Sequence, residues 1–104
     1  MPIEIGLILT MIFFLTFHVI PDSGNEVHDQ TQGAYINCWI EAENIELAKT
    51  ISAKSIKDMD WIILELQNAY EINITDYSPG SEGRQFHEQA LIGKEVYSIH
   101  QYAE

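Results

Sequence analysis

The chain has 104 residues, of which 46% are apolar, so it can bury one hydrophobic core and is not a disordered acidic tail. Sixteen acidic side chains face only five basic ones, which gives a net charge of −11. This charge disfavours binding to nucleic acid or to anionic lipid, and it favours a basic protein as partner.

The first element is an apolar run from Ile5 to Ile20, and it admits three interpretations. A signal peptide needs a basic start and a small-residue cleavage site, and neither is found. A transmembrane helix needs about 20 apolar residues with basic flanks, whereas this run is shorter and lacks them. A core β-strand fits best, because β-branched and aromatic residues dominate, and a membrane or export segment is the alternative. One face of the expected strand holds Met11, Phe13, Leu15, Phe17 and Val19.

Two further strands flank the clearest helix. A polar loop over residues 21–33 leads to a strand over 34–42, where alternation points Ile36, Cys38 and Ile40 inward. The outward positions of this strand are Tyr35, Asn37, Trp39 and Glu41. A helix is expected from residues 43–44 to 57–60, with acids in its first turn and lysines later. The next strand covers 61–66 and places Ile62, Leu64 and Leu66 on one face.

The C-terminal part predicts one more helix and one more strand. Residues 73–83 form a polar loop, and residues 84–91 form a short helix that packs Phe86 and Ala90, with Gly93 as its left-handed cap. A last strand covers 95–102. The order β-β-α-β-α-β predicts a single α+β domain over residues 1–104. We expect a two-layer sandwich, in which one principal helix covers one face of a mainly antiparallel four-stranded sheet.

The ending FHEQALIGKEVYSIHQY resembles the ending of a group of small bacterial proteins with no assigned function. That group also carries a strand similar to YINCWIEA before its main helix. The resemblance covers roughly the last two thirds of the chain, and it implies a cytosolic α/β domain without adding any chemistry. The matching positions are Phe86, Glu88, Gln89, Ala90, Leu91, Gly93, Val96, Tyr97 and His100.

No motif in the chain names a reaction. His87-Glu88 begins like a zinc-binding His-Glu-x-x-His helix, but Leu91 stands where the second ligand belongs. The single thiol, Cys38, has no partner for a disulfide, which fits a reducing cytoplasm. We therefore expect no enzyme, no metal and no cofactor. A small enzyme that uses His87, Glu88 and His100 is the least supported alternative.

The acidic surface and a set of aromatic side chains predict a protein-binding function. We expect the strands to turn Tyr35, Trp39, Trp61 and Tyr97 outward. Small acidic domains without catalytic motifs are typical of immunity or antitoxin proteins, which neutralise basic nuclease-type toxins. A self-associating structural or regulatory module, such as a homodimer, is the alternative. The residues predicted to bind the partner are Glu71, Asp76, Glu82, Glu88 and Glu95, with Tyr77 and Trp39 as apolar anchors.

Overall fold

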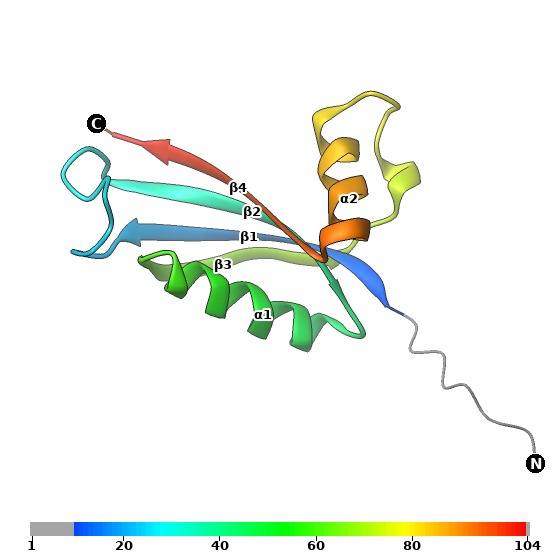
Figure 1. Ribbon diagram of the computed structural model, residues 1–104, viewed down its shortest axis with the longest axis horizontal. Coiled ribbons are helices and arrows are strands. Elements are labelled where there is room, and N and C mark those ends of the chain that lie inside the picture. The colour runs from blue at the N-terminus through cyan, green and yellow to red at the C-terminus, as the bar shows by residue number, and fades with distance from the viewer. Residues whose placement is uncertain (1–9, 104) are drawn as a thin grey trace, which may run out of the picture.

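The computed structural model describes residues 10–103, so residues 5–9 of the expected first strand lie outside the described part. Four antiparallel strands form one sheet in the order β3-β1-β2-β4, which confirms the predicted α+β class and element order (Figure 1). The elements are β1 (Met11–Pro21), β2 (Gly33–Ala42), α1 (Ile45–Asp58), β3 (Trp61–Glu71), the 3-10 helix η1 (Ile74–Asp76), α2 (Glu82–Gly93) and β4 (Glu95–Tyr102). Within the described residues, neither helix is long and apolar enough to cross a membrane.

Helix α1 covers the first face of the sheet and closes the main core. β1 lies inside the sheet between β3 and β2, and its odd-numbered residues face α1 as expected. The helix begins at the Asn44 cap, whose side chain accepts a hydrogen bond from the Leu47 amide at 2.8 Å. It then turns Ala48, Ser52 and Ile56 toward the sheet. The core on this face also contains Phe13, Leu15, Phe17, Val19, Ile36, Cys38 and Ile40.

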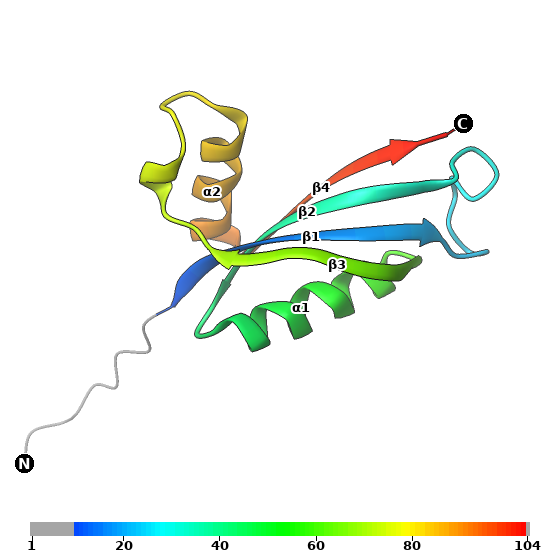
Figure 2. The ribbon, with the colours of Figure 1, turned by 180° about the vertical axis from the view of Figure 1, so that it is seen from behind.

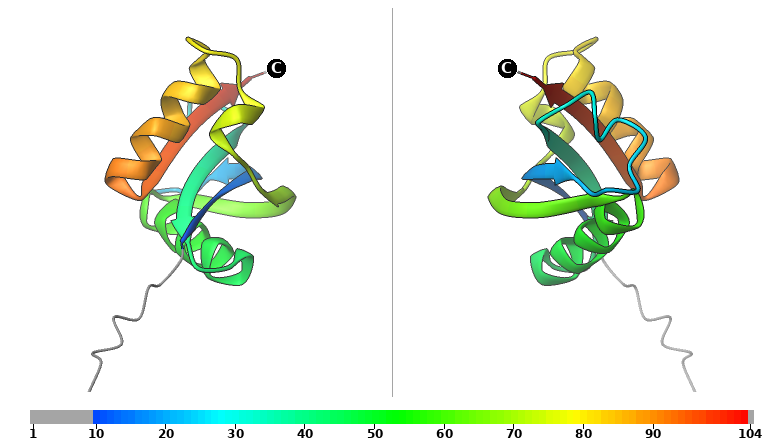
Figure 3. Two further views of the ribbon diagram at one scale, coloured as in Figure 1. Left: turned by 90° about the vertical axis from the view of Figure 1, so that its right-hand side faces the viewer. Right: turned by 90° about the vertical axis from the view of Figure 1, so that its left-hand side faces the viewer.

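Helix α2 packs on the opposite, second face of the sheet, as the views from the two ends show (Figure 3). Its Phe86 and Ala90 meet a smaller apolar cluster on β1, β2 and β4. The sandwich therefore gains a partial third layer, which the expected arrangement with one principal helix did not contain. The sheet side of this cluster consists of Ile12, Phe14, Trp39 and Val96.

The face of β3 was predicted wrongly from its alternation. Two register shifts against β1, between Thr16 and Phe17 and between His18 and Val19, break the period of two along the strand. As a result Trp61, expected to face outward, is only 5% exposed and belongs to the main core. Ile62 and Leu64 are the exposed residues instead.

Two local expectations near β4 were also wrong. Tyr97, expected to face outward, pairs in register with Cys38 and packs against the main core, where burial raises the pKa of its hydroxyl. The left-handed position that ends α2 is Lys94, with φ of 72°, and Gly93 is the last helical residue. The helix thus ends two residues beyond the expected end at Leu91.

Because the thiol of Cys38 is buried, we expect the protein to lose stability at alkaline pH. Burial raises the pKa of this thiol, whereas in the unfolded chain it ionises near pH 8.5. Between about pH 9 and pH 10 the unfolded state therefore loses a proton that the native state keeps. The free energy of unfolding should fall there by up to about 1.4 kcal/mol per pH unit. Urea unfolding of wild type and Cys38→Ala measures this, and an equal slope in both proteins would contradict it.

Candidate functional site

The second face of the sheet is covered at one end only. Helix α2 stands over the end where β1 and β4 begin, while the half toward the loop over residues 22–32 is open, as Figure 2 shows. In the described part of the chain, no helix packs on this half. We call it the open face. Strand register places on it Thr16, His18, Tyr35, Asn37, Glu65, Asn68, Ser98, His100 and Tyr102.

A cluster of three rings forms the centre of the open face. His18 of β1 stacks on Tyr35 of β2 with 4.7 Å between ring centroids, and Tyr35 stacks on Tyr102 of β4 at 5.6 Å. The Tyr102 hydroxyl and His18 Nε2 share a hydrogen bond of 2.6 Å, which links the first and last strands. Tyr35 keeps 39% of its surface exposed. The cluster is therefore a partly exposed aromatic platform of stacked rings that a partner can contact.

Polar side chains continue the open face beside this platform. Thr16 Oγ1 donates a hydrogen bond of 2.9 Å to Asn37 Oδ1, and Ser98 Oγ lies 2.9 Å from His100 Nε2. The sequence predicted an outward Tyr35, but it did not predict the contact between His18 and Tyr102. The available signal was the pair of polar residues at even positions of β1, Thr16 and His18. Only the strand register shows which residues of β2 and β4 lie beside them.

Gly33 makes room for the platform. Tyr102 lies in register with Gly33, and its ring crosses the space where a β-carbon would stand. A β-carbon built on Gly33 would come within 2.5 Å of the Tyr102 hydroxyl oxygen. Any other residue at this position would therefore push the ring away from His18.

The substitution Gly33→Ala should break the platform. We expect the loss of the contact between His18 and Tyr102 and a fall of roughly 1–3 kcal/mol in the free energy of unfolding. Gly93→Ala is the matched control, because nothing lies within 4 Å of its added β-carbon. Denaturant unfolding with NMR of the His18 ring measures both effects. Equal behaviour of the two variants would contradict the role given to Gly33.

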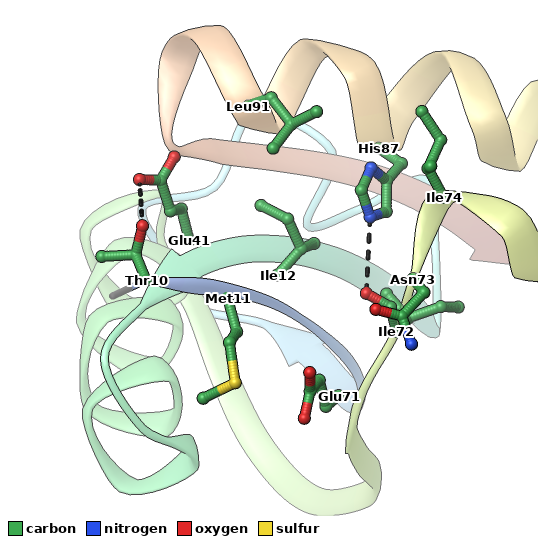
Figure 4. A pocket seen from close by; sticks show the side chains of 10 residues that line it. All are labelled: Thr10, Met11, Ile12, Glu41, Glu71, Ile72, Asn73, Ile74, His87 and Leu91. Carbon is green, nitrogen blue, oxygen red and sulfur yellow. Dashed lines mark hydrogen bonds between the residues drawn. The ribbon is translucent and has the colours of Figure 1, made fainter. Parts of the chain in front are cut away.

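A pocket of about 460 Å³ lies at the covered end, between α2, the start of β1 and the end of β3 (Figure 4). Glu41 stands on one side of it, where Thr10 donates a hydrogen bond of 2.7 Å to its carboxylate, and Glu71 stands on another. The walls between them are apolar and come from Met11, Ile12, Ile72, Ile74 and Leu91.

His87 of α2 also lines this pocket, and it is only 4% exposed. Its Nε2 lies 3.4 Å from the Ile72 carbonyl oxygen, a long contact, and its Nδ1 has no hydrogen-bond partner. A carbonyl can only accept, so this contact places the ring proton on Nε2. The residue is thus a buried imidazole with a weak anchor, and no nucleophile or acid stands within its hydrogen-bond contacts.

The residues of the enzyme alternative do not converge. Glu88 does not line the pocket, and its exposed carboxylate lies 3.5 Å from Arg84 Nε on the same helix. His100 pairs with Tyr35, six residues along β2 from Glu41 of the pocket, which is roughly 20 Å. Among residues 10–103, no three His, Cys, Asp or Glu side chains gather closely enough to hold a metal ion.

Trp39 does not have the exposure that the sequence predicted. It is only 4% exposed, because Phe14 and Phe86 of α2 pack against it, with ring centroids 5.2 Å and 4.7 Å from that of Trp39. Its Nε1 donates a hydrogen bond of 2.9 Å to the hydroxyl of Tyr77, which is half-buried and has a pKa raised by burial. Both expected anchors therefore hold α2 and its preceding loop on the sheet.

The predicted docking acids fall into separate groups. Asp76, Glu82 and Glu88 belong to η1 and α2, which contact each other, and all three are exposed. Glu71 lies at the end of β3 beside the pocket. Glu95 belongs to the first face, since its carboxylate accepts hydrogen bonds from Ser55 of α1 and from Tyr97, both at 2.8 Å.

The basic residues are segregated from the sheet. None of the four strands and no residue of the loop over 22–32 is a lysine or arginine. Three of the five basic residues belong to α1, on the first face. Two of these, Lys49 and Lys54, pair with Glu46 and Asp58 of the same helix. The open face thus carries the carboxylate of Glu65 and no lysine or arginine.

No protein-family model, curated protein or solved structure matches this chain. The resemblance of its C-terminal segment to small bacterial proteins therefore stays a prediction. A proposal about function therefore rests on the geometry and charge of this chain. The two most specific features are the open face and the segregation of the basic residues from the sheet.

Proposed function

We propose that this protein is a small acidic binding domain of the immunity or antitoxin type, which neutralises a basic, nuclease-type toxin domain. The observation that carries the proposal is the open face, an aromatic platform on a sheet whose strands contain no lysine or arginine. A basic partner meets no cation there. The net charge of −11 would also accelerate its approach.

The platform suits the side chains that a basic partner offers. A guanidinium group packs favourably on aromatic rings, and Tyr35 keeps 39% of its surface exposed within the stacked cluster. Glu65 lies in register with His18 on the neighbouring strand, so a carboxylate flanks the rings. An arginine of the partner would find both kinds of contact at one place.

The acids of η1 and α2 would form the margin of this interface. Asp76, Glu82 and Glu88 lie on the unit that covers the adjoining end of the same face. Being exposed, they contribute to steering more than to final affinity. Glu95, on the first face, would take no part, and Trp39 and Tyr77 would act by holding α2 in place.

A self-associating module is the second candidate, and one feature favours it. β3 is an edge strand, and it exposes Ile62 and Leu64 at 44% and 53%. Exposed apolar residues on a free edge invite pairing with another strand. The high negative charge opposes contact between two copies, so we place this candidate below the first.

Two charge reversals of equal size test the proposed surface. Association of the purified protein with the basic partner captured from its host is measured at low and at physiological ionic strength. Glu65→Lys on the open face should slow association several-fold and weaken its salt dependence. Glu46→Lys on α1 changes the net charge equally and should have a smaller effect. Tyr35→Ala should lower affinity about tenfold, mainly through faster dissociation.

Three results would contradict the proposal. Equal effects of Glu65→Lys and Glu46→Lys would show that only the total charge matters. Unchanged affinity of Tyr35→Ala would remove the platform from the interface. Capture that yields no basic protein, together with a dimer in sedimentation analysis, would favour the self-associating module.

A further inference from the structure

A second hollow lies on the first face, between α1 and the edge strand β3, and it has a different character from the open face. Its volume is about 620 Å³, within the range of small-molecule sites. Its walls are mostly apolar and come from Phe17 of β1, Ala53 of α1 and Trp61, Ile62, Ile63 and Leu66 of β3. We call it the α1–β3 groove.

Two lysines line this groove from α1. Lys49, Ala53 and Lys57 are spaced by four residues, so they form one stripe along the helix, and the two lysines are roughly 12 Å apart. Lys54, the third lysine of the helix, is absent from the lining and pairs with Asp58 at 2.8 Å. The chain has only five basic residues, and two of them line this one apolar groove. Positive charge is therefore concentrated there.

The nearby carboxylates leave this charge available. Glu46 lies 3.3 Å from Lys49, but the pair is solvent-exposed and therefore weak, so a ligand can replace it at little cost. Asp22 also lines the groove but pairs with neither lysine among the described residues, so the lining holds one more lysine than carboxylate. Lys57 makes no ion pair among the described residues.

From the apolar walls and the two lysines we infer that the α1–β3 groove binds an amphipathic anion, namely a single aliphatic chain that ends in a carboxylate. The chain would lie on Ile62, Ile63 and Leu66, with the nearly buried rings of Phe17 and Trp61 beneath it, and burying each CH₂ group there is favourable. The carboxylate would lie beside Lys49 or Lys57. This site is independent of the proposed partner surface, because it occupies the other face of the sheet.

The two tryptophans allow a direct test in the wild-type protein. Trp61 lines the groove, whereas Trp39 lies under α2 on the second face. Dodecanoate is titrated at concentrations below micelle formation, and the two indole N–H signals are followed by NMR. We expect the Trp61 signal to shift and saturate at one dodecanoate per chain while the Trp39 signal stays in place. Dodecyltrimethylammonium should give no saturable shift, because its charge is opposite.

The lysines are tested with a matched control on the same helix. Lys49→Gln combined with Lys57→Gln should weaken dodecanoate binding by roughly three- to tenfold, whereas Lys54→Gln should leave it unchanged. Each variant is first shown to be folded by the dispersion of its amide spectrum. An unshifted Trp61 signal, equal binding of the cationic detergent, or equal effects of the lysine variants would overturn the inference. Simultaneous shifts of both indoles would also overturn it, as they would indicate general detergent binding.

Discussion

The packing of Trp39 against Phe14 and Phe86 holds α2 on the sheet. The division of the second face into a covered end and the open face depends on this packing. Strand β1 lies inside the sheet, so both of its faces need cover wherever they are apolar. α1 covers one face along its length. On the other face the apolar residues Ile12 and Phe14 come first and the polar residues Thr16 and His18 follow, so α2 covers only the beginning of the strand.

The change from apolar to polar residues along β1 therefore sets the boundary between the covered and open regions, and β2 and β4 show the same change. Trp39 of β2 and Val96 of β4 lie beside the apolar half, whereas Asn37 and Ser98 lie beside the polar half. Where the polar half begins, the sheet replaces helix packing with its own cross-strand contacts, of which the bond between His18 and Tyr102 is the shortest. Because no helix of the described residues covers these contacts, they leave a surface that another molecule can reach.

The sequence predicted the fold well because its strongest signals are local. Alternation in β1 and β2 and the capped helix α1 each follow from residues close together in the chain. The burial of Trp39, Trp61 and Tyr97 could not be predicted. It depends on α2 covering Trp39, on two register shifts between β1 and β3, and on the pairing of Tyr97 with Cys38. Likewise, the sequence shows which residues are acidic, but only the topology shows that Glu95 lies on a different face from the acids of α2.

Charge and topology together divide the molecule. The lysines of α1 lie on the first face, next to an apolar groove, while the open face has tyrosines, histidines and a carboxylate. A uniformly acidic protein would attract any cation weakly over its whole surface. Under the proposed function, this distribution would direct a basic partner to the open face and would leave the first face to the proposed anionic ligand.

The central claim is that α2 is held on the second face by the Trp39 cluster and covers only part of it. Hydrogen exchange of the native Phe86→Ala variant tests this most directly, because Phe86 is the contact that α2 itself contributes to Trp39. The predicted result is that amides of α2 lose protection while those of α1 and β1 keep theirs, as expected of local opening. Equal loss across the whole sheet, or full protection of α2, would contradict the claim.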